Sequence, residues 1–118
     1  MQIKTLQGGL KKATIEMILL NLLAESDKYG YQLSQECKRR SDGQYSILEG
    51  SMYPILYRLE ESGYINSYEK KVGKRLSRVY YHLEEAGYKH LMHLREEYED
   101  YIKVIDNLLS FKGETDGQ

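Results

Sequence analysis

The last third of the chain carries an apolar stripe that one small domain cannot cover by itself. Between Glu84 and Ser110, apolar and tyrosine side chains recur at alternating spacings of three and four residues, the a/d pattern of a heptad seam. A chain of 118 residues fits one domain, and a helix this long extends past so small a core. The stripe therefore predicts a long helix that pairs with a second copy of the chain. The predicted dimer interface consists of Leu91, Leu94, Tyr98, Tyr101, Ile105 and Leu108.

Two helices are predicted near the start of the chain. Residues 10–25 place apolar side chains at the i, i+3, i+4, i+7 spacing of one buried face. Residues 29–40 form the second helix, with Leu33 and Cys37 directed inward. That helix ends in Lys38-Arg39-Arg40, and two explanations of this triplet stay open: favourable charge at the helix C-terminus, or contact with phosphate.

A third helix is predicted after a turn and a very short strand at residues 45–48. Ser51 is its expected N-cap, and Pro54 is expected in the first turn, where a missing N–H is tolerated. Gly63 is expected to end the helix in a left-handed conformation. The inward face of this helix is predicted to consist of Met52, Ile55, Leu56 and Leu59.

The segment between the third and the long helix predicts a β-hairpin. Its strands are residues 64–69 and 77–83, and the second alternates between two faces. Three helices, a hairpin and a long helix make a mainly α fold: a winged helix-turn-helix with a small β-hairpin wing and a C-terminal dimerisation helix. The predicted divisions are 1–83 for the DNA-binding domain, 84–111 for the dimerisation helix and 112–118 for a flexible tail.

The distribution of charge favours a nucleic-acid partner more than the net charge of −1 does. Residues 1–83 carry 13 Lys and Arg against 9 Asp and Glu, whereas residues 84–118 carry 4 against 9. A basic front half suits contact with phosphates, and an acidic back half suits a position away from them.

The third helix and the hairpin contain the candidate DNA contacts. The N-terminal part of a recognition helix meets base edges, and the outward residues there are Ser51, Tyr53, Pro54, Tyr57 and Arg58. The alternative is that the two tyrosines pack against neighbouring elements. A wing beside this helix reaches phosphates or the minor groove, and its basic residues are Lys70, Lys71, Lys74, Arg75 and Arg78. The alternative for this charge run is an ordinary solvated surface.

The sequence offers little for other chemistry. His90, His93 and Glu97 have a spacing that suits metal ligands on one helical side, but a metal-dependent sensor is the weaker hypothesis. Cys37, the single cysteine, fits a small core residue. We expect no catalytic residues, metal or cofactor, and hence no enzyme. The beginning of the sequence lacks the pattern of a secretory signal. The sequence also contains no apolar run long enough to span a membrane, so we expect a cytoplasmic protein without a membrane partner.

Several short motifs, in order, resemble the PadR family of bacterial transcriptional regulators. They are Tyr29-Gly30-Tyr31, the stretch from Gly50 to Glu60 (GSMYPILYRLE), Gly63-Tyr64-Ile65, and Arg78-Val79-Tyr80-Tyr81-His82-Leu83. The resemblance implies a homodimeric repressor of its own operon and of a neighbouring detoxification or efflux gene. It also implies binding to an inverted-repeat operator in double-stranded DNA and release by a small aromatic or lipophilic ligand. The single C-terminal helix resembles the smaller subfamily.

The chain departs from the family pattern at two points. Glu84 stands where the family usually has a threonine that caps the long helix, and no tryptophan is present to stack a flat ligand. Tyr98 and Tyr101 are then either aromatic walls for a ligand or packed interface residues.

The alternative function is a winged-helix protein-interaction module without specific DNA binding. Gly30 is expected to allow a neighbouring helix or backbone to approach the start of the second helix.

Overall fold

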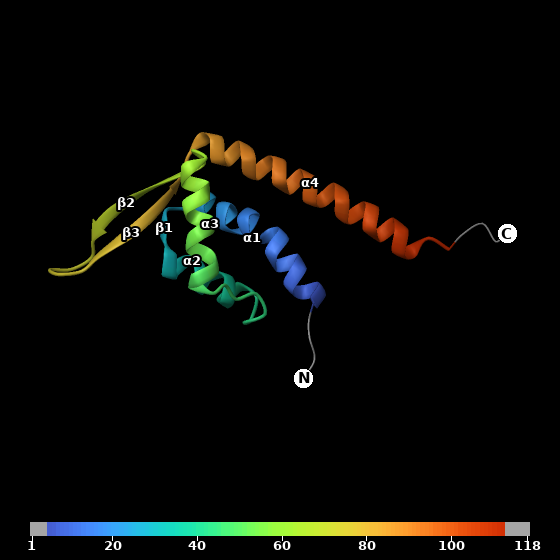
Figure 1. Cartoon of the computed structure of the whole chain (residues 1–118), viewed down its shortest axis with the longest axis horizontal. Coiled ribbons are helices and arrows are strands. Elements are labelled where there is room, and N and C mark those ends of the chain that lie inside the picture. The colour runs from blue at the N-terminus through green and yellow to red at the C-terminus, as the bar shows by residue number, and fades with distance from the viewer. Residues whose placement is uncertain (1–4, 113–118) are drawn as a thin grey trace.

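The computed structural model describes residues 5–112 and is an elongated molecule, 73 × 39 × 21 Å (Figure 1). The wing and the C-terminal end of the last helix project in opposite directions from a central group of helices. The mainly helical fold with a small wing, predicted from the sequence, is confirmed. Most of the predicted tail, residues 113–118, lies outside the described residues. The elements are α1 Thr5–Glu25, β1 Lys28–Tyr29, α2 Gly30–Arg40, α3 Glu49–Glu61, β2 Ile65–Lys71, β3 Ser77–Leu83 and α4 Glu85–Ser110.

One core joins all the helices to the base of the sheet. The predicted inward faces are confirmed: Leu33 and Cys37 of α2 are buried, as are three of the four predicted positions of α3, and Ile55 is partly buried. Burial of each such side chain stabilises the fold by about 1.5–3 kcal/mol. The fully buried side chains are Leu19, Leu20, Leu33, Met52, Leu56, Ile65 and Leu91.

The sheet has three antiparallel strands in the order β1-β3-β2. Sequence reasoning missed β1, whose two residues pair with Tyr80 and Tyr81 of β3. The short strand expected at residues 45–48 does not form. The Tyr45 N–H bonds instead to the hydroxyl of Ser41 at 2.7 Å, and the Tyr45 hydroxyl donates to the carbonyl of Lys11 at 3.2 Å. The first bond holds the loop to the end of α2, and the second fastens it to α1.

The start of α3 differs from the prediction, and its end agrees with it. Leu48, not Ser51, precedes the helix, and its carbonyl accepts bonds from the N–H groups of Ser51 and Met52. Pro54 is consequently the sixth helical residue, in the second turn, so the exposed carbonyl of Gly50 lacks its usual i+4 donor. Gly63, with φ of +80°, ends the helix as predicted.

A buried lysine closes α1 and directs the chain into β1. Lys28 is 4% exposed, and its ammonium group donates to the carbonyl of Leu22 at 2.7 Å and to the hydroxyl of Ser26 at 3.1 Å. Glu25 lies 3.4 Å from the same nitrogen. Lys28 therefore satisfies backbone acceptors at the C-terminal end of α1, where carbonyls lack helical partners.

The first turns of α4 belong to the core, and the rest of the helix leaves it. A Cβ at Gly87 would lie 2.0 Å from the carbonyl oxygen of Tyr64, so only glycine allows this approach. Further along, Leu108 and Leu109 are 74% and 80% exposed. Among residues 5–112, no helix has the length and apolar character needed to cross a membrane.

Candidate nucleic-acid interface

The predicted outward face of α3 is exposed in the structure. Tyr53 and Tyr57 are 41% and 63% exposed, and Ser51, Pro54 and Arg58 are exposed as well. Within the described residues Arg58 forms no ion pair, so its guanidinium donors are available. Partial burial, together with nearby Glu49, raises the pKa of Tyr53, so its hydroxyl stays protonated to a higher pH than that of an ordinary tyrosine.

Gly30 explains how Tyr53 is held. A Cβ on Gly30 would lie 2.2 Å from the Tyr53 hydroxyl oxygen and 2.7 Å from the ring carbon Cε1. From the sequence we expect a neighbouring helix or backbone to approach Gly30. In the structure, α3 approaches it through the ring of Tyr53. Tyr53 is packed on one side and 41% exposed, so the packing alternative holds in part, and its contact with DNA stays a prediction.

The five basic residues of the wing make no ion pair in the part of the chain that the structure describes. Lys70 and Arg78 face each other across the two strands, and each lies over an aromatic ring. The Lys70 ammonium is 5.2 Å from the ring centre of Tyr80, and the Arg78 guanidinium is 4.3 Å from that of Tyr29. Cation–π attraction offsets the repulsion between two like charges at directly opposed positions.

The rings beneath these cations form one aromatic cluster. Tyr80 packs edge-on against Tyr29 with centres 5.4 Å apart and stacks on Tyr68 with centres 5.8 Å apart. This cluster accounts for part of the tyrosine content of the chain, which has 12 tyrosines. It gives the outer face of the wing a rigid support for charged side chains.

An ion-pair network that sequence reasoning missed fastens the wing to the end of α1. Asp27 accepts a hydrogen bond from the Tyr68 hydroxyl at 2.6 Å and lies 2.8 Å from Nδ1 of His82. Partial burial raises the pKa of Asp27, but the bonds to Tyr68 and His82 outweigh it and lower the pKa below its ordinary value. The partners are 41 and 55 residues away in sequence, so no local pattern signals the network.

A hollow of about 400 Å³ lies between α3 and the wing. The residues that line this hollow come from several elements. Tyr53 belongs to α3, Arg78 and Val79 belong to β3, and Gly30 and Tyr31 belong to the start of α2. The structure thus brings one residue of the predicted recognition helix and one of the predicted wing to the same surface feature.

The basic triplet at the end of α2 has partners within the chain. Arg40 lies 2.7 Å from Glu25 and 2.9 Å from Glu36, and Arg39 lies 2.6 Å from Glu36. The hydrogen bond from Arg40 lowers the pKa of Glu25 to about 2. Two of the three cations therefore stabilise the joint between α1 and α2, which favours the structural explanation of the triplet over phosphate contact.

Comparison with known proteins identifies the family. Residues 19–93 match the model of the transcriptional regulator PadR-like family. The chain belongs to the PadR-like family of transcriptional regulators. A Lysinibacillus sphaericus protein described as uncharacterized protein X is 33% identical over 100 residues, which cover 85% of this chain and 92% of that protein.

Solved structures agree with this PadR-like assignment. A transcriptional regulator from Clostridium thermocellum has a TM-score of 0.78 at 34% identity, over 89% of this chain and 99% of that one. A PadR family transcriptional regulator from Eggerthella lenta has the same fold, with a TM-score of 0.81 at 24% identity over 92% of each chain.

In this PadR-like regulator, the predicted seam on α4 divides into a buried and an exposed part. Leu91 is fully buried in the core of its own chain, so its side chain offers no surface to a partner. Leu94 and Ile105 are partly buried, whereas Tyr98, Tyr101 and Leu108 are 45%, 64% and 74% exposed. A groove of about 800 Å³ separates this exposed part from α1, and Leu10, Ala13 and Met17 form its α1 side.

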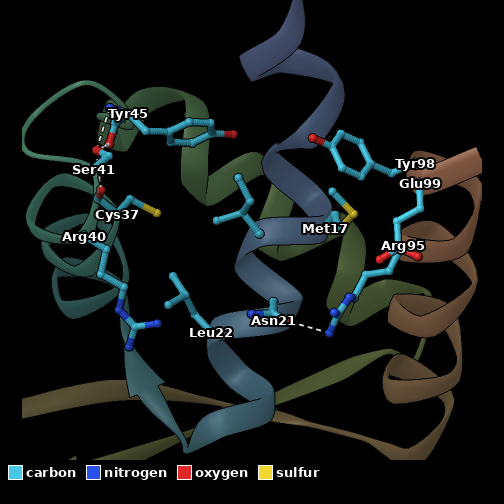
Figure 2. A pocket seen from close by; sticks show the side chains of 11 residues that line it. Met17, Asn21, Leu22, Cys37, Arg40, Ser41, Tyr45, Arg95, Tyr98 and Glu99 are labelled. Carbon is cyan, nitrogen blue, oxygen red and sulfur yellow. Dashed lines mark hydrogen bonds between the residues drawn. The ribbon is translucent and has the colours of Figure 1, made fainter. Parts of the chain in front are cut away.

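A second cavity of the PadR-like chain, of about 510 Å³, lies among α1, α2 and α4. Figure 2 shows Cys37, Arg40 and Tyr45 on one side of α1 and Arg95 and Tyr98 on the other. Arg95 donates to the side-chain oxygen of Asn21 at 3.5 Å. The lining is largely apolar, and its charged residues are Arg40, Arg95 and Glu99. Burial raises the pKa of the Cys37 thiol, which disfavours the reactive thiolate.

The two histidines of α4 in this regulator have different surroundings. His90 bonds to Glu16 and stacks on the ring of Tyr64, whereas His93 is exposed. Within residues 5–112, no group of three His, Cys, Asp or Glu is placed to hold a metal ion. Because His90 is engaged with α1, the spacing of His90, His93 and Glu97 does not produce a three-residue metal site in this structure.

Proposed function

We propose that this PadR-like regulator is a homodimeric repressor that binds an inverted-repeat operator through α3 and the wing. The single observation that supports it most is the hollow between α3 and β3, where Tyr53 and Arg78 meet. A recognition helix beside a wing with unpaired cations matches the needs of DNA binding, in which base edges and phosphates are contacted together. The residues proposed to contact DNA are Ser51, Tyr53, Pro54, Tyr57 and Arg58 of α3, and Lys70, Lys71, Lys74, Arg75 and Arg78 of the wing.

The exposed apolar face of α4 supports the dimer. Tyr101, Leu108 and Leu109 are each more than 60% exposed in one chain, and Leu6 of α1 is 75% exposed. A face of this kind on a regulator is a binding surface, and a second α4 offers the complementary heptad pattern. We assign residues 1–83 to DNA binding and residues 84–111 to dimerisation. Light scattering should give a particle of twice the chain mass of 13.9 kDa.

The cavity of Figure 2 supports release by a small aromatic or lipophilic ligand. Its walls come from α1 and α2 of the proposed DNA-binding domain and from the proposed dimerisation helix α4, so an occupant would contact both parts of the chain. To release DNA, the ligand must bind more tightly to a dimer whose recognition helices no longer match successive major grooves. The regulated genes that the family resemblance suggests are its own operon and a neighbouring detoxification or efflux gene.

Fluorescence anisotropy tests the function. Labelled DNA from immediately upstream of the regulator's own gene is titrated at several salt concentrations beside a scrambled duplex. A specific regulator should prefer the upstream DNA by about a thousandfold or more, with a steep dependence on salt. Equal and weak binding to both duplexes would contradict autoregulation and support a protein-interaction module.

A further inference from the structure

The hollow between α3 and the wing exists because β1 is very short. β1 pairs with Tyr80 and Tyr81 of β3 and then turns into α2 at Gly30. The next residues of β3 toward the wing tip, Val79 and Arg78, have no strand beside them on that side. The space that a longer β1 would occupy is the hollow, and the side chain of Tyr53 enters it from α3.

Three of the residues that line this space, Tyr31, Tyr53 and Arg78, carry side-chain donors that are not used within the described part of the chain. The hydroxyls of Tyr31 and Tyr53 have no hydrogen-bond partner there, and Arg78 has neither an ion pair nor a hydrogen bond. The Tyr29 ring supports Arg78 from one face, which leaves the N–H groups at the edge of the guanidinium free. No carboxylate lines the hollow.

Tyrosine hydroxyls and arginine guanidinium groups are among the donors that proteins direct at phosphate oxygens of DNA. We propose that this hollow, the Gly30 seat, holds one phosphate of the DNA backbone, bound by Arg78 and by the hydroxyls of Tyr31 and Tyr53. The inference rests on the proposed DNA-binding function and adds Tyr31 and Gly30 to it. The donors come from α2, α3 and β3, so a phosphate in the seat contacts both the proposed recognition helix and the wing.

Gly30 gives the seat a test that separates binding from folding. The three atoms nearest to a Cβ at this position all belong to the end of the Tyr53 side chain, which is 41% exposed, so the ring and not the backbone has to move. Gly30 adopts no positive φ, and alanine favours a helix more than glycine does. Gly30→Ala should therefore keep or raise the midpoint of urea denaturation, yet weaken DNA binding about tenfold because Tyr53 leaves the seat.

Two further variants separate the contributions of charge and hydroxyl. Arg78→Gln should weaken binding about tenfold and lower the salt slope by about one unit per protomer. Tyr31→Phe removes an uncharged donor, so affinity should fall several-fold while the salt slope stays unchanged. Tyr88→Phe is the matched control, because Tyr88 is 51% exposed on α4 and does not line the hollow.

A scan of the DNA backbone identifies the phosphate. Single phosphates of the bound duplex are replaced in turn by neutral methylphosphonate. At one position in each half-site, the loss of affinity should be clearly smaller for Arg78→Gln than for wild type, because the charge pair with Arg78 is already gone. At every other position the two proteins should lose equally. Losses that add at every position would overturn the seat and leave the proposed repressor intact. If wild type binds no duplex, the proposed function and the seat fail together.

Discussion

His90 of α4 bonds to Glu16 of α1, with 2.6 Å between Nε2 and Oε2, while its ring stacks on Tyr64 at 4.2 Å between centres. One side chain thus joins α1, the segment between α3 and β2, and the helix proposed to form the dimer. Glu16 and His90 are 74 residues apart in sequence, so the contact holds the two ends of the fold together. The contact therefore links α4 directly to α1 within one chain.

Removal of this contact should destabilise the fold. His90→Ala loses a partly buried hydrogen bond and an aromatic contact, so the free energy of unfolding should fall by about 1–3 kcal/mol. Urea denaturation at one fixed chain concentration measures the effect, since dimerisation adds to apparent stability. His93→Ala is the matched control one turn along α4, where the side chain is exposed. Equal effects of the two substitutions would show that the His90–Glu16 bond has no role in stability.

Two glycines of the chain should respond to alanine in opposite directions. At Gly87 a Cβ would overlap the backbone carbonyl of Tyr64, which also accepts a bond from the Glu84 N–H at 2.9 Å. Because backbone must move, Gly87→Ala should cost more than about 2 kcal/mol of stability. At Gly50 a Cβ meets no atom within 4 Å, so Gly50→Ala should stabilise α3 by about 0.5–1 kcal/mol. Thermal melts of both variants beside wild type check the difference in sign.

The hydrophobic spacing in the sequence predicted much of this architecture, because periodic patterns report which faces are buried. The buried face of α3 and its end at Gly63 follow from local rules, and so does the alternation in β3. β1 could not be predicted because two residues carry no period, and Lys28 could not because an isolated lysine indicates solvent exposure. The hollow at Gly30 depends on where a tyrosine from another helix comes to lie, and no local pattern records that.

Glu25 should make stability depend on pH at the acid end. Its pKa, lowered to about 2 mainly by the hydrogen bond from Arg40, lies below the ordinary value of 4.5. A carboxylate with a lowered pKa in the folded state contributes stability above its unfolded pKa and loses it as pH falls toward the folded pKa. The side chain is 40% exposed, so solvent screening limits the contribution to about 1 kcal/mol.

The corresponding experiment compares wild type with Glu25→Gln at neutral pH and at about pH 3. The stability advantage of wild type should shrink as the solution becomes acid. Glu85→Gln is the control, because Glu85 is 85% exposed and its distance to Lys89 is 3.7 Å. A difference between wild type and Glu25→Gln that stays constant with pH would mean that Glu25 acts through packing and not through its charge.

Substitutions in the wing and in α3 should affect DNA binding in different ways. Lys74 and Arg75 lie at the exposed wing tip without ion pairs in the described chain, so they are free to contact phosphates. Changing both to alanine should weaken binding to every duplex and lower the salt slope by about two units per protomer. Anisotropy titrations over a range of salt concentrations measure the slope. An unchanged slope would show that the wing tip does not contact the backbone.

Arg58→Ala provides the contrasting variant on α3. If the Arg58 guanidinium bonds to a guanine edge, its loss should cost about 1–3 kcal/mol at one base position and relax the preference there. The same anisotropy measurement, repeated on a set of single-base variants of the operator, gives the position. A uniform loss over all duplexes, with a shallower salt slope, would instead place Arg58 on a phosphate. The two variants together thus separate the element that reads sequence from the element that supplies electrostatic attraction.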